Sequence, residues 1–164
     1  MSDQISIQSY KGKYNASFIR GGMDQLNKYP IENAIYIVDQ NIVRLYSDRL
    51  GNILNSQRVI KITATERNKS LDCFPDYIDA LVELKVRRGQ TLVAIGGGII
   101  QDITCFLAAT MMRGMPWVFY PTTLLAQSDS CIGSKSSINS GDIKNILGTF
   151  TPPNKIVIDV DFLS

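Results

Sequence analysis

The chain has 164 residues, of which 45% are hydrophobic and 20% charged, so a folded domain with a real core is expected and a disordered chain is excluded. Its 17 basic and 15 acidic residues give a net charge of +2, which is too small to indicate nucleic acid or a membrane surface as a partner. No apolar run reaches the roughly 20 residues of a membrane-spanning helix.

The metal-binding and redox residues are few. Histidine is absent, and the three cysteines, Cys73, Cys105 and Cys131, are widely spaced. This pattern favours reduced thiols over a disulfide framework or a zinc cluster, so no metal site is expected within the chain itself. The N-terminus lacks a signal-peptide pattern, and a cytoplasmic location is therefore expected.

The first third of the chain predicts a hairpin and then a strand–helix unit. Residues 4–20 partly alternate apolar and polar side chains around Gly12, which favours an edge β-hairpin. The elements expected next are a short helix at 24–29, a strand at 34–38, a helix at 42–50 ended by Gly51, and a strand at 58–63.

The rest of the chain continues the alternation of strand and helix. A polar loop is expected at 63–70, then a helix that ends at Arg88 with Gly89 as its cap. The run 91–95, which is apolar after Thr91, is typical of a strand covered on both faces. The later elements expected are a helix from the glycines to about Met112, a strand at 117–120, a short helix capped by Thr122, an ordered loop at 131–150 and a strand at 155–159. Met111, Met112 and Trp117 are interpreted as core residues.

These elements predict an α/β fold: a Rossmann-like, mostly parallel sheet with helices on both faces and an N-terminal β-hairpin, in a single domain over residues 1–164.

Three glycines, Gly96 to Gly98, connect a predicted buried strand to a predicted helix. Such a turn lets backbone N–H groups approach a phosphate at the helix N-terminus. The dinucleotide fingerprint G-x-G-x-x-G nevertheless fails, because Gln101 stands at its third glycine. A tight turn that needs positive φ is the other reading, and the residues alone leave both open.

Polar residues follow several predicted strands, where open α/β sheets bind ligands. Asp39 and Asn41 suit a ribose contact or a helix N-cap, and Glu66 and Lys69 suit a ligand or a solvated i,i+3 pair. Asp102 either complements a helix dipole or binds a ligand hydroxyl.

A second set of charges suggests an anionic substrate. Arg113 suits either a helix C-terminus or an anion clamp. Lys135, Lys144 and Asn145 would grip a carboxylate or phosphate, and Asp129 would orient a hydroxyl or move a proton. Surface charge on a polar loop is the alternative, but a structureless loop of about twenty residues usually has a function.

Several motifs together resemble the N-terminal half of the 3-dehydroquinate synthases and their sugar-phosphate cyclase relatives. They are VDQN at 38–41, TERNK at 65–69, GGGIIQD at 96–102, AATMMRG at 108–114, PTTLLAQSDSCIGSK at 121–135, KNILGTF at 144–150 and PPNKIVID at 152–159. The resemblance covers nearly the whole chain in order and is most specific from residue 96 onward.

The resemblance implies an NAD site and part of a substrate site. The implied NAD-site residues are Asp39, Asn41, Glu66, Lys69, Gly97, Gly98, Ile99, Asp102, Thr122, Thr123, Leu125, Asp129 and Ser130. The implied substrate residues are Arg113, Asp129, Lys135, Lys144 and Asn145, with Asp129, Lys135 and Asn145 as the catalytic set and Arg113 able to act across a dimer.

The resemblance also implies a reaction of the shikimate pathway of aromatic amino acid biosynthesis. It is the NAD-dependent cyclisation of 3-deoxy-D-arabino-heptulosonate 7-phosphate to 3-dehydroquinate, in which phosphate is lost, and the class of enzyme is a lyase. A divalent metal, zinc or cobalt, would act as a Lewis acid on ligands that this chain lacks, so the chain alone is expected to be inactive. A cytoplasmic homodimer is implied, with no nucleic-acid or membrane partner.

The chain departs from the family pattern at Gln101, Ser128, Ser134 and Ser136. These departures keep other readings open. The first is a cyclase of the 2-epi-5-epi-valiolone or 2-deoxy-scyllo-inosose synthase type. The others are a non-catalytic NAD-binding module and, more weakly, an oxidoreductase resembling glycerol dehydrogenase.

Overall fold

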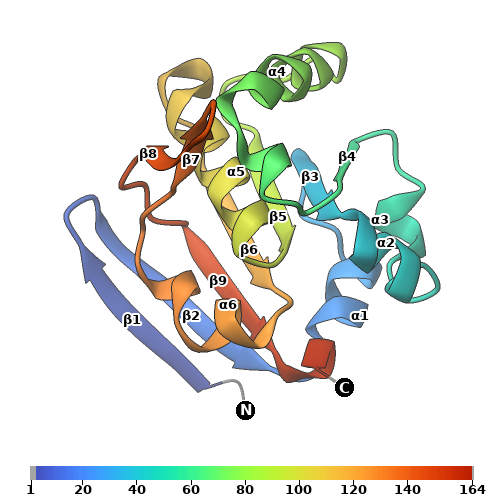
Figure 1. Cartoon of the computed structure of the whole chain (residues 1–164). Helices are drawn as coiled ribbons and strands as arrows, with labels where there is room; N and C mark the ends of the chain where they lie inside the picture. Colours follow the sequence, from blue (N-terminus) through green and yellow to red (C-terminus); the bar gives the residue numbers. More distant parts are fainter. Residues whose placement is uncertain (1–2, 164) are drawn as a thin grey trace.

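The computed structural model describes residues 3–163 and shows a seven-stranded sheet between two layers of helices (Figure 1). The strands lie in the order β1-β2-β9-β6-β5-β3-β4, with β1 and β2 antiparallel and the other neighbours parallel. Their bounds are β1 Asp3–Ser9, β2 Gly12–Ile19, β3 Ala34–Asp39, β4 Val59–Ile62, β5 Thr91–Gly96, β6 Trp117–Pro121 and β9 Lys155–Asp159. The predicted α/β class and the N-terminal hairpin are therefore confirmed.

A second sheet has two strands, β7 Ile138–Ser140 and β8 Ile143–Leu147. The α-helices are α1 Gly22–Lys28, α2 Gln40–Tyr46, α3 Gly51–Leu54, α4 Phe74–Glu83, α5 Gly98–Thr110 and α6 Leu124–Ser128. Short 3₁₀ helices are η1 Arg67–Lys69, η2 Leu71–Cys73, η3 Met111–Arg113, η4 Ser130–Ile132 and η5 Val160–Leu163. No helix among residues 3–163 combines the length and apolar character needed to cross a bilayer.

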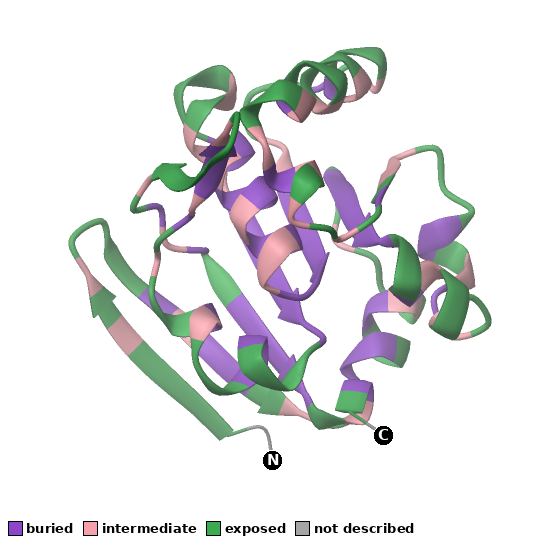
Figure 2. Ribbon diagram, viewed as in Figure 1, coloured by how far each residue is buried: buried purple, intermediate pink, exposed green. Residues whose placement is uncertain are grey.

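Alternate side chains of each central strand enter different cores. In β3, Ile35 and Ile37 pack into the core beneath α5, whereas Tyr36 and Val38 pack into the core beneath α1 to α3. Because neighbouring strand residues point to opposite faces, a strand that is buried throughout must be covered on both sides. Figure 2 shows this as continuous burial along the middle strands.

The strand order places a topological switch between β3 and β5. The chain passes from β3 to β4 on one side and then crosses back to β5 on the other side of β3. Val38 pairs with Ile95, so the next residues, Asp39 and Gly96, both lie at the carboxyl edge of the sheet. Open α/β sheets bind ligands in the crevice at such a point.

The helix predicted to end at Arg88 ends earlier, at Glu83. Lys85 adopts a φ of 54°, its N–H donates to the Val82 carbonyl, and the Val86 N–H donates to the Leu81 carbonyl. These two bonds form a Schellman cap, and burial of Val86 in the core stabilises it. The prediction of a cap at Gly89 is wrong because a non-glycine residue takes the left-handed position.

The helix predicted at 42–50 is shorter than expected, and a second helix follows it. α2 ends at Tyr46, and Gly51 begins α3 instead of ending the first helix. The residue that caps α6 is Thr123 and not the predicted Thr122. Thr123 Oγ1 accepts the Ala126 N–H at 3.2 Å.

Two further expectations need correction. The predicted loop at 131–150 contains η4 and the β7–β8 hairpin. Met112 is 40% exposed and so is not a core residue, because its φ of 52° turns the chain out of the end of α5. Trp117 is buried in the core as predicted, and its indole N–H donates to the Thr151 carbonyl at 3.1 Å.

Candidate functional site

The glycine turn joins β5 to α5 by close packing. None of the three glycines has a positive φ, so the tight-turn reading of the sequence is wrong. A Cβ on Gly96 would lie 2.5 Å from Ile100 Cγ1, and one on Gly97 would lie 2.9 Å from Thr123 Cγ2. A Cβ on Gly98 would meet nothing nearer than Ser130 Oγ at 3.9 Å. The space beside Gly98 is therefore open to a ligand.

The N-terminus of α5 has donors to offer such a ligand. Its N-cap, Gly97, supplies no side-chain hydrogen bond to the first turn of this 13-residue helix. The first N–H groups of a helix have no partner inside it, and the helix dipole favours negative charge at that end. An uncapped first turn beside an open space suits a phosphate group.

The ends of β6 and β3 border this turn. The Thr122 N–H donates to the Gly96 carbonyl at 2.9 Å, which ties β6 to the glycines. At the end of β3, the buried Asp39 accepts the Asn41 N–H at 2.9 Å and so caps α2. The helix-cap interpretation of Asp39 is thus confirmed, and its place at the switch point puts it at the same edge of the sheet as the glycine turn.

Gln101 connects the start of α5 with η4. The side chain is only 4% exposed; its Nε2 donates to the Ser130 carbonyl at 2.6 Å, and its Oε1 accepts the Ser130 hydroxyl at 2.9 Å. Sequence reasoning noted Gln101 only as a departure from a pattern. The signal in the sequence was its position directly after Ile99 and Ile100 near the start of a predicted helix, where a polar side chain that becomes buried needs a partner.

Lys69 is the centre of a second group of predicted residues. Its Nζ lies 3.2 Å from Asp102 Oδ2, 3.0 Å from Asn145 Oδ1 and 3.4 Å from Glu66 Oε1. The Lys69 side chain is 8% exposed, so this ammonium is largely removed from water. The structure therefore brings together four of the predicted site residues, from the loop after β4, from α5 and from β8.

The pKa values of the two carboxylates in this group, Asp102 and Glu66, are shifted in opposite directions. Burial raises the pKa of Asp102, against the opposing effects of Lys69 and of the Ser137 N–H. A hydrogen bond from the Asn139 carboxamide, assisted by Lys69, lowers the pKa of the more exposed Glu66. The ion pair of Lys69 with Asp102 is thus the one whose charges are most affected by desolvation.

Asn139 on β7 was missed by sequence reasoning. Its Nδ2 donates to Glu66 Oε1 at 2.9 Å, and its Oδ1 accepts the Asn145 N–H at 2.8 Å. The signal was present: Gly141-Asp142 is a turn dipeptide between two short runs that each contain isoleucine, which predicts a hairpin. The hairpin positions Asn145, whose φ is 57°.

A cavity of about 630 Å³ lies between the loop after β4 and this hairpin. Its lining includes Glu66, Asp72, Asn139 and Lys144. Lys144 is exposed, and its charge contributes to the lowered pKa of Glu66. The cavity thus presents carboxylates, an ammonium group and a carboxamide to a ligand beside the Lys69 group.

The remaining candidates are exposed and more dispersed. Leu125 is 69% exposed on α6, Asp129 follows that helix, and Lys135 forms an isolated bridge with Phe150. Arg113 lies at the far end of α5, about 20 Å along the helix from the glycine turn. Within one chain, Arg113 therefore lies far from the candidate residues at the glycine turn.

The described residues 3–163 contain no group of three or more His, Cys, Asp or Glu side chains placed to hold a metal ion.

A comparison with protein families gives a match: the model of the family described as 3-dehydroquinate synthase N-terminal matches residues 59–164.

The chain belongs to the 3-dehydroquinate synthase family.

Relatives of known name agree with this membership. A 3-dehydroquinate synthase of Natranaerobius thermophilus is 33% identical, over 93% of this chain and 48% of that protein. The chain thus spans about half the length of the curated relatives that it matches.

Solved structures of sugar-phosphate cyclases have the same fold. A 2-deoxy-scyllo-inosose synthase superposes with a TM-score of 0.80 at 25% identity, over 99% of this chain and 47% of that one. The 2-epi-5-epi-valiolone synthase of Streptomyces hygroscopicus, solved with NAD⁺ and Zn²⁺, has a TM-score of 0.79 at 29% identity, over 92% of this chain and 44% of that one.

Proposed function

We propose that this chain forms the NAD-binding part of a 3-dehydroquinate synthase, as a single α/β domain. The observation that carries the proposal is the uncapped N-terminus of α5, which opens beside Gly98 at the switch point of the sheet. Membership of the family and the NAD⁺ bound to the 2-epi-5-epi-valiolone synthase support it.

In this proposal the cofactor lies across the carboxyl edge of the sheet. The first N–H groups of α5 bind its pyrophosphate, and Asp39 with Asn41 binds a ribose at the end of β3. Lys69, held by Asp102 and Asn145, supplies positive charge on one side of the cofactor. The other proposed contacts are Glu66, Gly97, Ile99, Thr122, Thr123, Leu125, Asp129 and Ser130.

NAD held at this site would supply hydride chemistry: the carbon that bears a ring hydroxyl of the substrate would give up a hydride to it, the hydroxyl would give up its proton, and the hydride would later be returned. The side chains of this chain hold and orient the sugar phosphate. Lys135, Lys144 and Asn145 bind its anionic groups, and Asp129 holds the hydroxyl proton near the cofactor. Positioning supplies most of their catalytic effect, because a correctly oriented substrate has already lost its translational freedom.

Other parts of the proposal concern the whole protein. A divalent metal, zinc or cobalt, would be held by residues outside these 164. The protein would act as a cytoplasmic homodimer on a small-molecule substrate, and Arg113 would then contribute to the site of the partner subunit. Its distance along α5 from the glycine turn, which keeps it away from the site in its own chain, supports this last point.

A second candidate is another sugar-phosphate cyclase. It is favoured by the match over nearly the whole chain to structures of two such enzymes. The curated relatives instead carry the name 3-dehydroquinate synthase.

Substrate choice distinguishes the two candidates. The complete protein, with NAD and a divalent metal, is incubated with 3-deoxy-D-arabino-heptulosonate 7-phosphate or with sedoheptulose 7-phosphate. Release of phosphate from the first supports the proposal, whereas release from the second alone would establish the alternative. Lys135→Ala in the same protein should raise KM for the sugar phosphate, and an unchanged KM and kcat would refute its anion-binding role.

A further inference from the structure

A basic cavity of about 490 Å³ opens at the edge of the sheet opposite to the glycine turn. Its lining residues include Asn33, Arg58 and Gln90, which directly precede β3, β4 and β5, whereas the glycines follow β5. A volume of this size is typical of sites for small molecules.

The charge of this cavity is of one sign. Arg58, Lys85, Arg87 and Arg88 line it, and no acidic residue does. Within residues 3–163, the ion pairs of the structure involve other residues, so none of these four cations is neutralised by a carboxylate. Lys85, Arg87 and Arg88 are exposed to solvent, and cations of one sign around one hollow attract an anion.

Arg58 lines this cavity with a guanidinium that has an unused donor. Its Nε donates to the Ala34 carbonyl at 3.0 Å, which fixes the guanidinium, while its Nη2 is buried without an acceptor among the described residues. Buried polar groups normally have a partner, and each exception needs an explanation. Because Nη2 is closed off from solvent, a phosphate oxygen would become its acceptor only after the guanidinium turned toward the cavity.

The turn opposite Arg58 is held in a defined shape. The Arg87 N–H donates to Gln90 Oε1 at 2.8 Å, Gly89 has a φ of 90°, and Lys85 has a φ of 54°. These backbone constraints present three cations from six consecutive residues to the same cavity. Arginine is suited to phosphate because its planar donors match two oxygens at once.

We propose that this cavity binds the phosphate group of a small phosphorylated metabolite. The site is separate from the proposed NAD site, since the two lie at opposite edges of the sheet. The proposal therefore stands or falls independently of the proposed function.

Nuclear magnetic resonance of the ¹⁵N-labelled chain tests the proposal with inorganic phosphate as the probe. The titration is made at constant ionic strength, with chloride replaced by phosphate up to about 20 mM, above the millimolar affinity expected of a few charge-assisted contacts. Saturable shifts are expected for the amide signals of Arg58 and of residues 85–90. Shifts confined to residues 96–99, or no shifts, would overturn the proposal.

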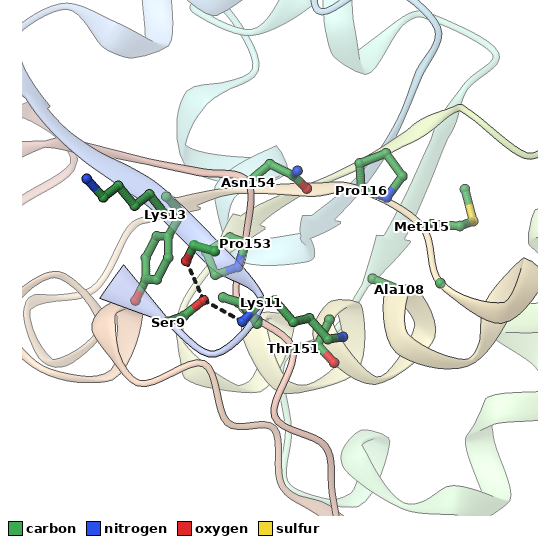
Figure 3. Close-up of a pocket in the computed structure, with 13 residues that line it drawn as sticks. Ser9, Lys11, Lys13, Ala108, Met115, Pro116, Thr151, Pro153 and Asn154 are labelled. Carbon is green, nitrogen blue, oxygen red and sulfur yellow. Dashed lines mark hydrogen bonds between the residues drawn. The ribbon is translucent and has the colours of Figure 1, made fainter. Parts of the chain in front are cut away.

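Two double variants separate a site from a general effect of charge. Arg87→Gln with Arg88→Gln should weaken phosphate binding at least about tenfold. The matched control is Lys11→Gln with Lys13→Gln, which removes two charges from another cavity, of about 330 Å³, beside the β1–β2 turn (Figure 3). An equal loss of binding in both double variants would contradict the proposal. Arg58→Lys, which keeps the charge and loses the planar donors, should also weaken binding.

Discussion

Lys69 Nζ lies 3.2 Å from Asp102 Oδ2, so that one largely buried ion pair fastens the loop after β4 to the N-terminal half of α5. The same ammonium also donates to Asn145 of β8. Three segments that are distant in the sequence thus meet at one cation, next to the proposed cofactor site.

Lys69→Met should destabilise the chain by about 3 kcal/mol, because Asp102 would remain partly buried without its cation. Urea unfolding at neutral pH measures this change. Lys61→Met is the matched control, since Lys61 is exposed on β4 and its removal should change stability by less than about 0.5 kcal/mol. Equal small effects of both substitutions would show that the Lys69 group contributes little to stability.

Gln101→Ala should lower the free energy of unfolding by about 1–3 kcal/mol, since the Ser130 carbonyl loses a buried donor. The affinity for NAD should fall as well, because Ser130 lies beside Gly98 at the open space. Gln25→Ala on the exposed face of α1 serves as the control for both measurements. An unchanged unfolding midpoint for Gln101→Ala would mean that η4 is held by its other contacts.

Gly98→Ala separates binding from stability. The added methyl meets nothing nearer than 3.9 Å, so stability should stay the same or rise by up to about 1 kcal/mol. NAD affinity should fall at least about tenfold, because the methyl occupies the space of the phosphate. Gly51→Ala, at the start of α3 with its nearest atom at 4.0 Å, should leave NAD binding unchanged. Full NAD affinity in Gly98→Ala would place the pyrophosphate elsewhere.

In the native chain, the thiol of Cys73 should react much faster than the thiols of Cys105 and Cys131. Burial raises the pKa of Cys131 to about 11 and also raises the pKa of Cys105, and both side chains are 1% exposed. At pH 8 these groups remain protonated thiols, which are poor nucleophiles. Iodoacetamide followed by mass spectrometry should therefore label the partly exposed Cys73 first and the other two only after unfolding. Native labelling of Cys131 at the rate of Cys73 would contradict this burial.

The parallel strands could be predicted from sequence to within one or two residues. Runs such as 34–38 and 92–95 are apolar throughout and are followed by polar or glycine residues, so length and composition both identify them. The charged residues after these strands were identified for the same reason, because the carboxyl edge of a parallel sheet is where a ligand binds.

Other features depend on tertiary contacts that have no local pattern. The residues of β8 are exposed along its whole length, so the Gly141-Asp142 turn is its main signal in the sequence, and its contacts with Lys69 and Asn139 have none. The end of α4 is set by the buried Val86, and a lysine takes the left-handed position that glycine usually fills. The partnership of Gln101 with Ser130 joins residues 29 positions apart.

Calorimetric titration of this chain with NAD tests the central claim most directly. The account predicts binding of one NAD per chain with a dissociation constant below about 1 mM, since the proposed cofactor contacts all lie within the 164 residues. The absence of binding heat at millimolar NAD, in a chain that unfolds cooperatively, would contradict the assignment of the glycine turn as a cofactor site.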